Sequence, residues 1–130
     1  MQADPAGGSR ATVLLAEDDP AIRSVAKRFL EADGFRVLEA KSGEEAARLG
    51  ARHAGDLDVL IADLVMPGFG GPDLAERLVR DRPGLKVLFL SGYSEAEARV
   101  RDPRVARAPF LQKPFTAQAL RDALTGLLAT

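Results

Sequence analysis

The sequence predicts an α/β domain in which a parallel five-stranded sheet lies between two layers of helices. Five short apolar runs alternate with longer amphipathic segments along a chain of 130 residues, which is the length of one domain. Short apolar runs are typical of strands that are buried on both faces, and alternation with helices predicts parallel strands joined by crossovers. With 46% hydrophobic residues, the chain can bury one core. The expected strands are residues 12–16, 35–40, 59–62, 85–90 and 110–111.

The first two helices follow from residue spacing and from capping residues. Between Ile22 and Leu30, apolar residues recur at the spacing of one helix face, and Gly34 ends that helix. Ser42 is followed three residues later by Glu45, which is the pattern of a capping box at the start of a second helix. These helices follow the first and second expected strands, as the alternation requires.

The remaining three helices are predicted from the same signals. Apolar residues within 74–79 mark a third helix, which ends before Pro83. The fourth helix is expected to be short, near residues 94–101, because Pro103 interrupts a segment that is rich in Ala and Arg and poor in apolar anchors. The fifth helix begins after Thr116 and carries the apolar stripe Leu120, Leu124, Leu127 and Leu128.

The composition excludes several functions. The formal net charge is −1, so we expect no direct binding of nucleic acid through phosphate neutralisation. The absence of cysteine excludes disulfides, thiol catalysis and cysteine-ligated zinc, and it is compatible with a cytoplasmic location. No apolar run approaches the roughly 20 residues that span a bilayer, so no membrane contact is expected. Residues 1–10 lack the apolar core of a secretory signal and are interpreted as a flexible lead-in to a domain at 11–130.

Polar side chains at the ends of the expected strands form a candidate site. In a doubly wound sheet, ligands bind at the carboxyl ends of the strands. Glu17 and Asp18 follow the first strand, Asp63 the third, Ser91 the fourth and Lys113 the fifth. Core packing does not explain this set, because each of these groups costs desolvation energy unless it is paired.

The chemistry that this set supports is magnesium-dependent phosphoryl transfer. The carboxylates of Asp18 and Asp63 can chelate Mg²⁺, and Glu17 can hold a metal-bound water. Asp63 can also act as a nucleophile, since carboxylates form acyl-phosphate intermediates. Lys113 supplies positive charge and Ser91 supplies a hydrogen-bond donor for the phosphoryl oxygens.

Taken together, these motifs resemble the receiver domain of two-component response regulators. The acidic pair follows the first strand in VLLAEDDP, and an Asp precedes MPG in VLIADLVMPG. A Ser follows the fourth strand in VLFLSGY, and a Lys-Pro pair follows the fifth in FLQKPF. The resemblance covers residues 11–128. It implies a three-layer, flavodoxin-like (βα)5 fold with the strand order 2-1-3-4-5.

The resemblance implies roles for the residues of the acidic pocket. Asp63 is the expected phosphoacceptor, and Asp18 is the expected direct ligand of Mg²⁺, for which Mn²⁺ could substitute. The backbone carbonyl of Val65 and the Asp63 carboxylate complete the protein ligands, and Glu17 binds the ion through a water molecule. Receiver domains more often have Asp at the position of Glu17.

The resemblance also implies how the phosphoryl group is held and sensed. Ser91 is expected to hydrogen-bond the attached group, and Lys113 to pair with Asp63 or its phosphate. A cis Lys113–Pro114 bond is expected to direct the lysine into the pocket. Phe110 stands at the switch aromatic of the family, so Ser91 and Phe110 form the expected switch.

The predicted function is a phosphorylation switch. The domain takes a phosphoryl group from a histidine kinase or a histidine phosphotransfer domain onto Asp63 and signals to an unidentified partner. The expected output face combines the fourth helix, the fifth strand and the fifth helix. Such a domain is not an enzyme in the ordinary sense, because it catalyses only its own phosphorylation and dephosphorylation. Because no output domain follows Thr130 in this sequence, we expect either a stand-alone receiver or one cut from a hybrid kinase or a longer regulator. The strings LSGY and FLQKPF resemble those of receivers attached to sensor kinases, which favours a hybrid kinase.

Two alternative functions stay open from the sequence. One is a small Mg²⁺-dependent phosphohydrolase of Rossmann-like fold, although such enzymes usually carry Asp-x-Asp after the first strand. The other is a phosphorylation-deficient pseudo-receiver that acts as a binding module, against which the complete set of acids, hydroxyl and lysine argues.

Three polar or aromatic residues outside the site are assigned no chemistry. Asp19 is expected to cap the first helix. His53 is the one histidine of the chain and is expected to be solvent-exposed and without function. Tyr93 is expected to be a surface aromatic that could join the output face.

Overall fold

A computed structural model describes residues 11–129, and its helices and strands alternate along that whole range. The lead-in expected at residues 1–10 lies outside the described residues. The strands are β1 (Thr12–Ala16), β2 (Arg36–Ala40), β3 (Val59–Asp63), β4 (Lys86–Ser91) and β5 (Phe110–Gln112). The helices are α1 (Pro20–Ala32), α2 (Gly43–Arg52), α3 (Gly71–Asp81), α4 (Glu95–Arg101), a 3₁₀ helix η1 (Pro103–Val105) and α5 (Ala117–Leu128).

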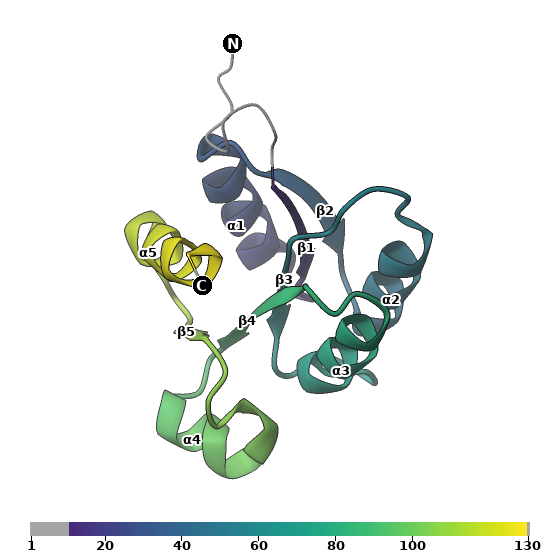
Figure 1. Ribbon diagram of the computed structural model, residues 1–130. Coiled ribbons are helices and arrows are strands. Elements are labelled where there is room, and N and C mark those ends of the chain that lie inside the picture. Colours follow the sequence, from purple (N-terminus) through teal and green to yellow (C-terminus); the bar gives the residue numbers. More distant parts are fainter. Residues whose placement is uncertain (1–10, 130) are drawn as a thin grey trace.

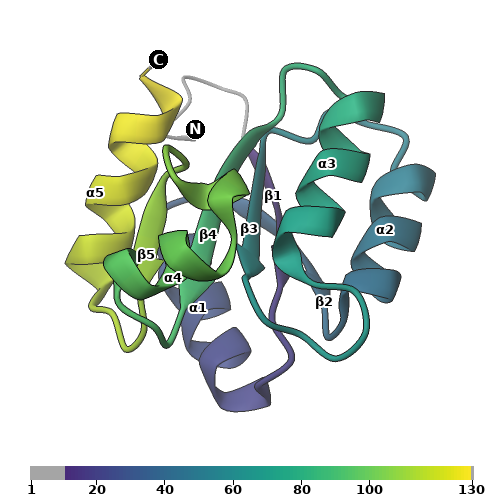
Figure 2. The same ribbon diagram turned by 90° about the horizontal axis from the view of Figure 1, so that it is seen from below.

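The five strands form one parallel sheet in the order β2-β1-β3-β4-β5, which confirms the predicted fold and strand order. Figures 1 and 2 show the sheet as the middle of three layers. Buried residues of α1 and α5 pack on one face of the sheet, and those of α2, α3, α4 and η1 pack on the other. The winding direction changes beside β1, so the carboxyl ends of β1 and β3 border the crevice where such sheets bind ligands.

The central strands are buried on both faces because successive side chains point to opposite sides of the sheet. In β1, Val13 and Leu15 face the core beneath α1 and α5, whereas Leu14 and Ala16 face the core beneath α2 and α3. All residues of β1 and β3 are buried. This burial on both sides is what a continuous apolar run, rather than an alternating one, predicts.

The ends of β3 and β4 carry two residues of the candidate site. Asp63 is the last residue of β3, where the apolar run leads directly into it, and Ser91 is the last residue of β4, whereas it was expected just after that strand. Each polar group therefore ends a hydrogen-bonded strand, which holds its backbone more firmly than a loop does. The starts of β2 and β4 each lie one residue later than expected, at Arg36 and Lys86.

The helix starts confirm the predicted N-caps Asp19, Ser42 and Thr116. Asp19 accepts hydrogen bonds from the first backbone N–H groups of α1, and Thr116 accepts from Ala119 N at the start of α5. The capping box predicted at Ser42 is wrong in one half. Ser42 accepts from Glu45 N, but the Glu45 carboxylate reaches back to Lys41 N, one residue before the cap. A complete capping box occurs at α4, between Ser94 and Glu97.

The α4 region is short, as predicted, but it is better anchored than its composition suggests. Ala98 on α4 and Val105 on η1 are both buried in the core beneath α2 and α3. Arg104 on η1 also reaches across to α3, where it pairs with Asp73 at 2.9 Å and with Glu76 at 3.0 Å. Apolar anchors and ion pairs therefore both fasten this segment to the rest of the domain.

Two other expectations about exposure are wrong. His53, the C-cap of α2, is half-buried rather than exposed. The Arg82 guanidinium donates to the carbonyls of His53, Gly50 and Gly55, which caps the end of α2. Leu128, the last member of the predicted α5 stripe, is exposed, whereas Leu120 and Leu124 are buried.

Candidate acidic phosphoacceptor site

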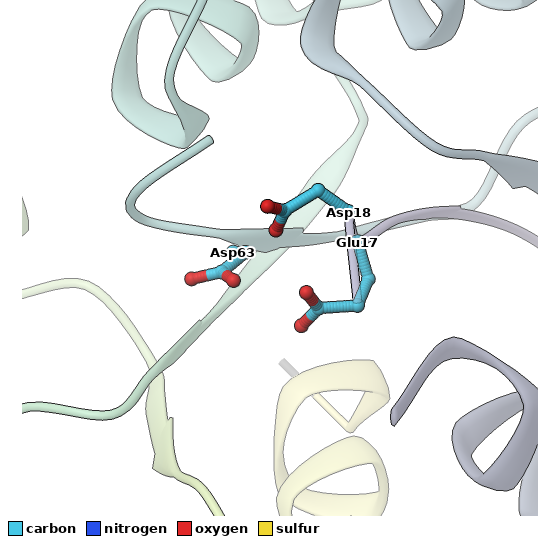
Figure 3. A group of neighbouring side chains, drawn as sticks. All are labelled: Glu17, Asp18 and Asp63. Carbon is cyan, nitrogen blue, oxygen red and sulfur yellow. The ribbon is translucent and has the colours of Figure 1, made fainter. Parts of the chain in front are cut away.

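Three carboxylates from two strand ends meet at the carboxyl edge of the sheet (Figure 3). Glu17, Asp18 and Asp63 each offer an oxygen, and these oxygens lie within 4.8 Å of one another. The Glu17 side chain is completely buried, Asp63 is nearly so, and Asp18 is exposed. An exposed carboxylate beside two buried ones gives a solvent-accessible set of oxygen donors, which fits a hard divalent cation such as Mg²⁺.

Lys113 lies between two of these acids. Its Nζ is 2.7 Å from Asp63 Oδ2 and 3.1 Å from Glu17 Oε1. The Lys113–Pro114 peptide bond is cis, as expected, and Lys113 N donates to Ser91 O at 2.8 Å. Burial acts to lower the pKa of Lys113, but the hydrogen bonds to Asp63 and Glu17 outweigh it and raise that pKa. Lys113 therefore carries a fixed positive charge in the site.

Glu17 is held in place by several contacts, and its protonation is perturbed. Its Oε2 accepts a hydrogen bond from Asp19 N at 3.0 Å, and its backbone N donates to Ala40 O on β2. Burial raises the pKa of Glu17 to about 7, and the charge of Asp63 adds to the increase, whereas the contacts with Asp19 and Lys113 oppose it. Near neutral pH and without a cation, both the protonated and the charged form of the Glu17 carboxyl are therefore populated.

Residues on either side of Asp63 differ in how closely they approach it. Val65, two residues later, is 60% exposed, and Val65 N donates to Asp63 Oδ1 at 3.3 Å. On the other side, α3 begins directly against the strand end. A Cβ atom on Gly71 would lie 2.4 Å from Asp63 O, so a residue without a side chain is required there.

All five of the predicted strand-end residues line one open pocket of about 500 Å³: Glu17, Asp18, Asp63, Ser91 and Lys113. The Ser91 side chain is buried, and its Oγ accepts a hydrogen bond from Tyr93 N at 2.9 Å. The prediction that these residues meet is confirmed.

The two aromatic residues near the pocket differ in their placement. Tyr93 is half-buried and lines the pocket, with the Arg101 guanidinium 4.1 Å above its ring. Its expected place at the surface is therefore only partly correct. Phe110 is half-buried on β5 and packs against the core beneath α2 and α3, and it does not line the pocket.

One contact of the site has no signal in the sequence. Arg23 on α1 donates from Nη1 to Glu17 O at 2.8 Å. An arginine in the first turns of an amphipathic helix looks like an ordinary solvated charge. The contact depends on how the chain turns between β1 and α1, which residue spacing does not reveal.

Two carboxylates of this acidic pocket, Glu17 and Asp63, both contact Lys113. The pocket lies at the carboxyl edge of a five-stranded doubly wound sheet, and this combination is typical of phosphoacceptor signalling domains. The family model of the response regulator receiver domain matches residues 13–125. This chain belongs to that family, and it is a receiver domain of two-component systems.

Comparisons with relatives agree with this assignment. The sensor kinase CckA of Brucella abortus (strain 2308) is 38% identical over 118 residues, which is 91% of this chain and 12% of the kinase. The crystal structure of the receiver domain of the hybrid histidine kinase CckA has a TM-score of 0.76 at 36% identity and covers 91% of this chain and 99% of that chain. The response regulator TrrA of Thermotoga maritima, solved in complex with Mg²⁺ and BeF, has a TM-score of 0.77 at 27% identity, with coverage of 90% and 98%.

The curated relatives are longer than the segment that matches this chain. The chain spans 12%, 31% and 42% of the lengths of three curated relatives that it matches. Within residues 11–129, no helix is both long enough and apolar enough to cross a bilayer.

Proposed function

We propose that this receiver domain accepts a phosphoryl group on Asp63 from a phosphohistidine of a histidine kinase or a histidine phosphotransfer domain in the cytoplasm. The observation that carries the proposal is the arrangement at Asp63. Its carboxylate is buried, lies 2.7 Å from the ammonium of Lys113 and remains reachable through a pocket that Asp18 also lines. A carboxylate held only for packing or for structural ion pairing has no need of an open pocket.

The transfer is an in-line displacement at phosphorus. A carboxylate oxygen of Asp63 forms the new bond to phosphorus, and the bond from phosphorus to the imidazole nitrogen breaks. The electron pair of the broken bond stays on the imidazole, and the product is an acyl phosphate. Lys113 donates toward the charge that gathers on the phosphoryl oxygens, and it is already placed at hydrogen-bond distance from Asp63.

The acidic residues are proposed to hold Mg²⁺, with Mn²⁺ as a substitute. The donors are the carboxylates of Asp18 and Asp63 and the carbonyl of Val65, while Glu17 contributes through a water molecule. When bound, the ion offsets negative charge on the transferring phosphoryl oxygens. The Mg²⁺ and BeF complex of the related TrrA supports this assignment.

Ser91 and Phe110 are proposed to convert the new phosphate into a change of shape. The Ser91 hydroxyl now accepts from Tyr93 N, and it can turn to donate to a phosphoryl oxygen instead. Phe110 lies on the neighbouring strand, with Phe89 and Phe110 paired in register. A movement of the Phe110 side chain would alter the face formed by α4, β5 and α5, where we place the output partner.

The test is incubation with acetyl phosphate and Mg²⁺, followed by intact mass spectrometry. We expect one labile phosphoryl group on the wild-type protein and none on Asp63→Asn, together with slow autodephosphorylation. Multiple-turnover hydrolysis of unrelated phosphate esters would instead support a phosphohydrolase. Failure to bind either Mg²⁺ or a phosphate analogue would support a pseudo-receiver. Transfer from a histidine kinase is tested by repeating the assay with a phosphorylated kinase as the donor.

A further inference from the structure

Arg23 connects the acidic pocket to the neighbouring edge strand β2. Its Nη1 donates to Glu17 O at 2.8 Å, and its Nε lies 3.5 Å from the carboxylate of Glu39 on β2. The Arg23 side chain is only 20% exposed, although it carries a full charge. Surface solvation alone does not explain why an arginine beside the candidate cation site is this largely covered and makes two polar contacts.

We propose that Arg23 is a positioning residue of this site and that it sets the affinity for Mg²⁺. The carbonyl that it holds belongs to the peptide unit that joins Glu17 to Asp18. A peptide unit is planar and rigid, so fixing its carbonyl also fixes the direction in which the chain leaves toward Asp18. This inference rests on the proposed function, because it concerns the same cation site.

Asp18 depends on its backbone for its orientation. Within residues 11–129, its carboxylate accepts no hydrogen bond and forms no ion pair. Glu17 is different, since its side chain is held by Lys113 and by Asp19 N. The proposed direct ligand of the ion is therefore the acid with the fewest restraints of its own. The hydrogen bond from Arg23 to Glu17 O restrains the peptide unit that directly precedes Asp18.

Arg23 has a second partner in Glu39, whose carboxylate forms an ion pair with its Nε at 3.5 Å. Leu15 and Glu39 are paired in register on β1 and β2, so the Glu39 side chain starts from a rigid strand. Glu39 also binds Lys27 at 3.0 Å, one helical turn beyond Arg23. Only a branched guanidinium can hold a carbonyl and a carboxylate at the same time in a fixed geometry, whereas an ammonium is a single point of charge.

Charge and positioning predict opposite effects when Arg23 is replaced. Removal of a positive charge near three carboxylates would by itself strengthen Mg²⁺ binding. Loss of the restraint on Asp18 would weaken it. Partners that orient the ligands of a metal typically change its affinity by about 10-fold or more, so positioning should prevail. The direction of the measured change therefore separates the two explanations.

The experiment measures the Mg²⁺ dissociation constant by isothermal titration calorimetry on folded wild-type, Arg23→Met, Arg23→Lys and Lys27→Met proteins. Lys27→Met is the matched control, because it removes the same charge from Glu39 without touching Glu17. We expect Arg23→Met to weaken Mg²⁺ binding by about 10-fold, Arg23→Lys to lie between it and the wild type, and Lys27→Met to bind Mg²⁺ as the wild type does or slightly more tightly. Phosphorylation of Arg23→Met at saturating Mg²⁺ should approach the wild-type rate.

Each other outcome counts against the inference in a distinguishable way. If Arg23→Met binds Mg²⁺ as tightly as the wild type or more tightly, the inference is overturned and the proposed function stands. The same holds if Lys27→Met loses as much Mg²⁺ affinity as Arg23→Met does. Absence of Mg²⁺ binding by the wild type overturns both. If Arg23→Met does not fold, Glu39→Gln replaces it, since that change removes the ion pair and keeps the arginine. It should weaken Mg²⁺ binding by a smaller factor, and an unchanged affinity would overturn the inference.

Discussion

Replacing Lys113 with Met tests whether this lysine neutralises the acidic pocket. The change keeps the length of the side chain and removes the ammonium that contacts Asp63 and Glu17. All three side chains are 14% exposed or less, so the two carboxylates would be left facing each other without a counter-charge. Removing one partner of a buried ion pair costs about 3–5 kcal/mol, and because this pocket is open on one side, we expect about 3 kcal/mol at pH 8.

The size of this loss should depend on pH, with a sign that the structure determines. The contact with Lys113 lowers the pKa of Glu17, so the variant should have a higher pKa than the value of about 7 in the wild type. Protonation of Glu17 removes one of the two unpaired charges, so the difference in the free energy of unfolding should fall to about 1 kcal/mol at pH 5. Mg²⁺ should also restore stability, because it supplies the missing positive charge.

The assay is urea unfolding followed by circular dichroism, since the chain has no tryptophan. Wild-type and Lys113→Met proteins are compared at pH 5 and pH 8, with EDTA and with Mg²⁺. Lys27→Met is the control, because its ion pair with Glu39 is exposed and should contribute little. A loss of stability that is the same at both pH values and in Mg²⁺ would refute the view that Lys113 acts through charge in this pocket.

Three further predictions concern neighbouring residues. In EDTA, the wild-type protein should lose stability as the pH rises from about 4.5 to about 7, because the folded state raises the pKa of Glu17 and so binds its proton more tightly than the unfolded state; Glu17→Gln should flatten that slope in urea unfolding. Gly71→Ala should lower the melting temperature and slow phosphorylation, because its Cβ would meet Asp63 O, whereas Gly126→Ala, which has nothing within 4 Å, should be neutral or stabilising. Ser91→Ala should leave the Mg²⁺ dissociation constant within about 2-fold of the wild type and weaken beryllofluoride binding by about 10-fold or more, the loss of one hydrogen bond to a charged group; equal losses in both titrations would contradict this role.

The fold was predictable because its signals are local and repeated. β1 and β3 read as short apolar runs because they are buried on both faces, and the caps at Asp19 and Thr116 act within three residues of sequence. The strand order is different, since no local pattern encodes which strands are neighbours. It came from the resemblance to receiver domains, and the structure confirms it.

The candidate site was predictable to the extent that strand ends meet at one edge of a parallel sheet. That rule alone placed Asp63 and Lys113 near each other, although they are far apart in sequence. What the rule could not supply were contacts that depend on loop paths and side-chain reach. Glu45 extends to Lys41 N rather than to its expected cap, and Arg23 turns back to Glu17 O. Arg82, at the end of α3, donates a hydrogen bond to the His53 carbonyl, 29 residues earlier in the chain.

The most direct test of the account is a crystal structure of this domain with Mg²⁺ and beryllofluoride, which mimics the phosphorylated aspartate. The account predicts beryllium bonded to an oxygen of Asp63, with Lys113 Nζ and Ser91 Oγ within hydrogen-bond distance of its fluorine atoms and the cation on Asp18 and Asp63. A structure in which Asp63 stays free while Lys113 keeps its present contacts would contradict it.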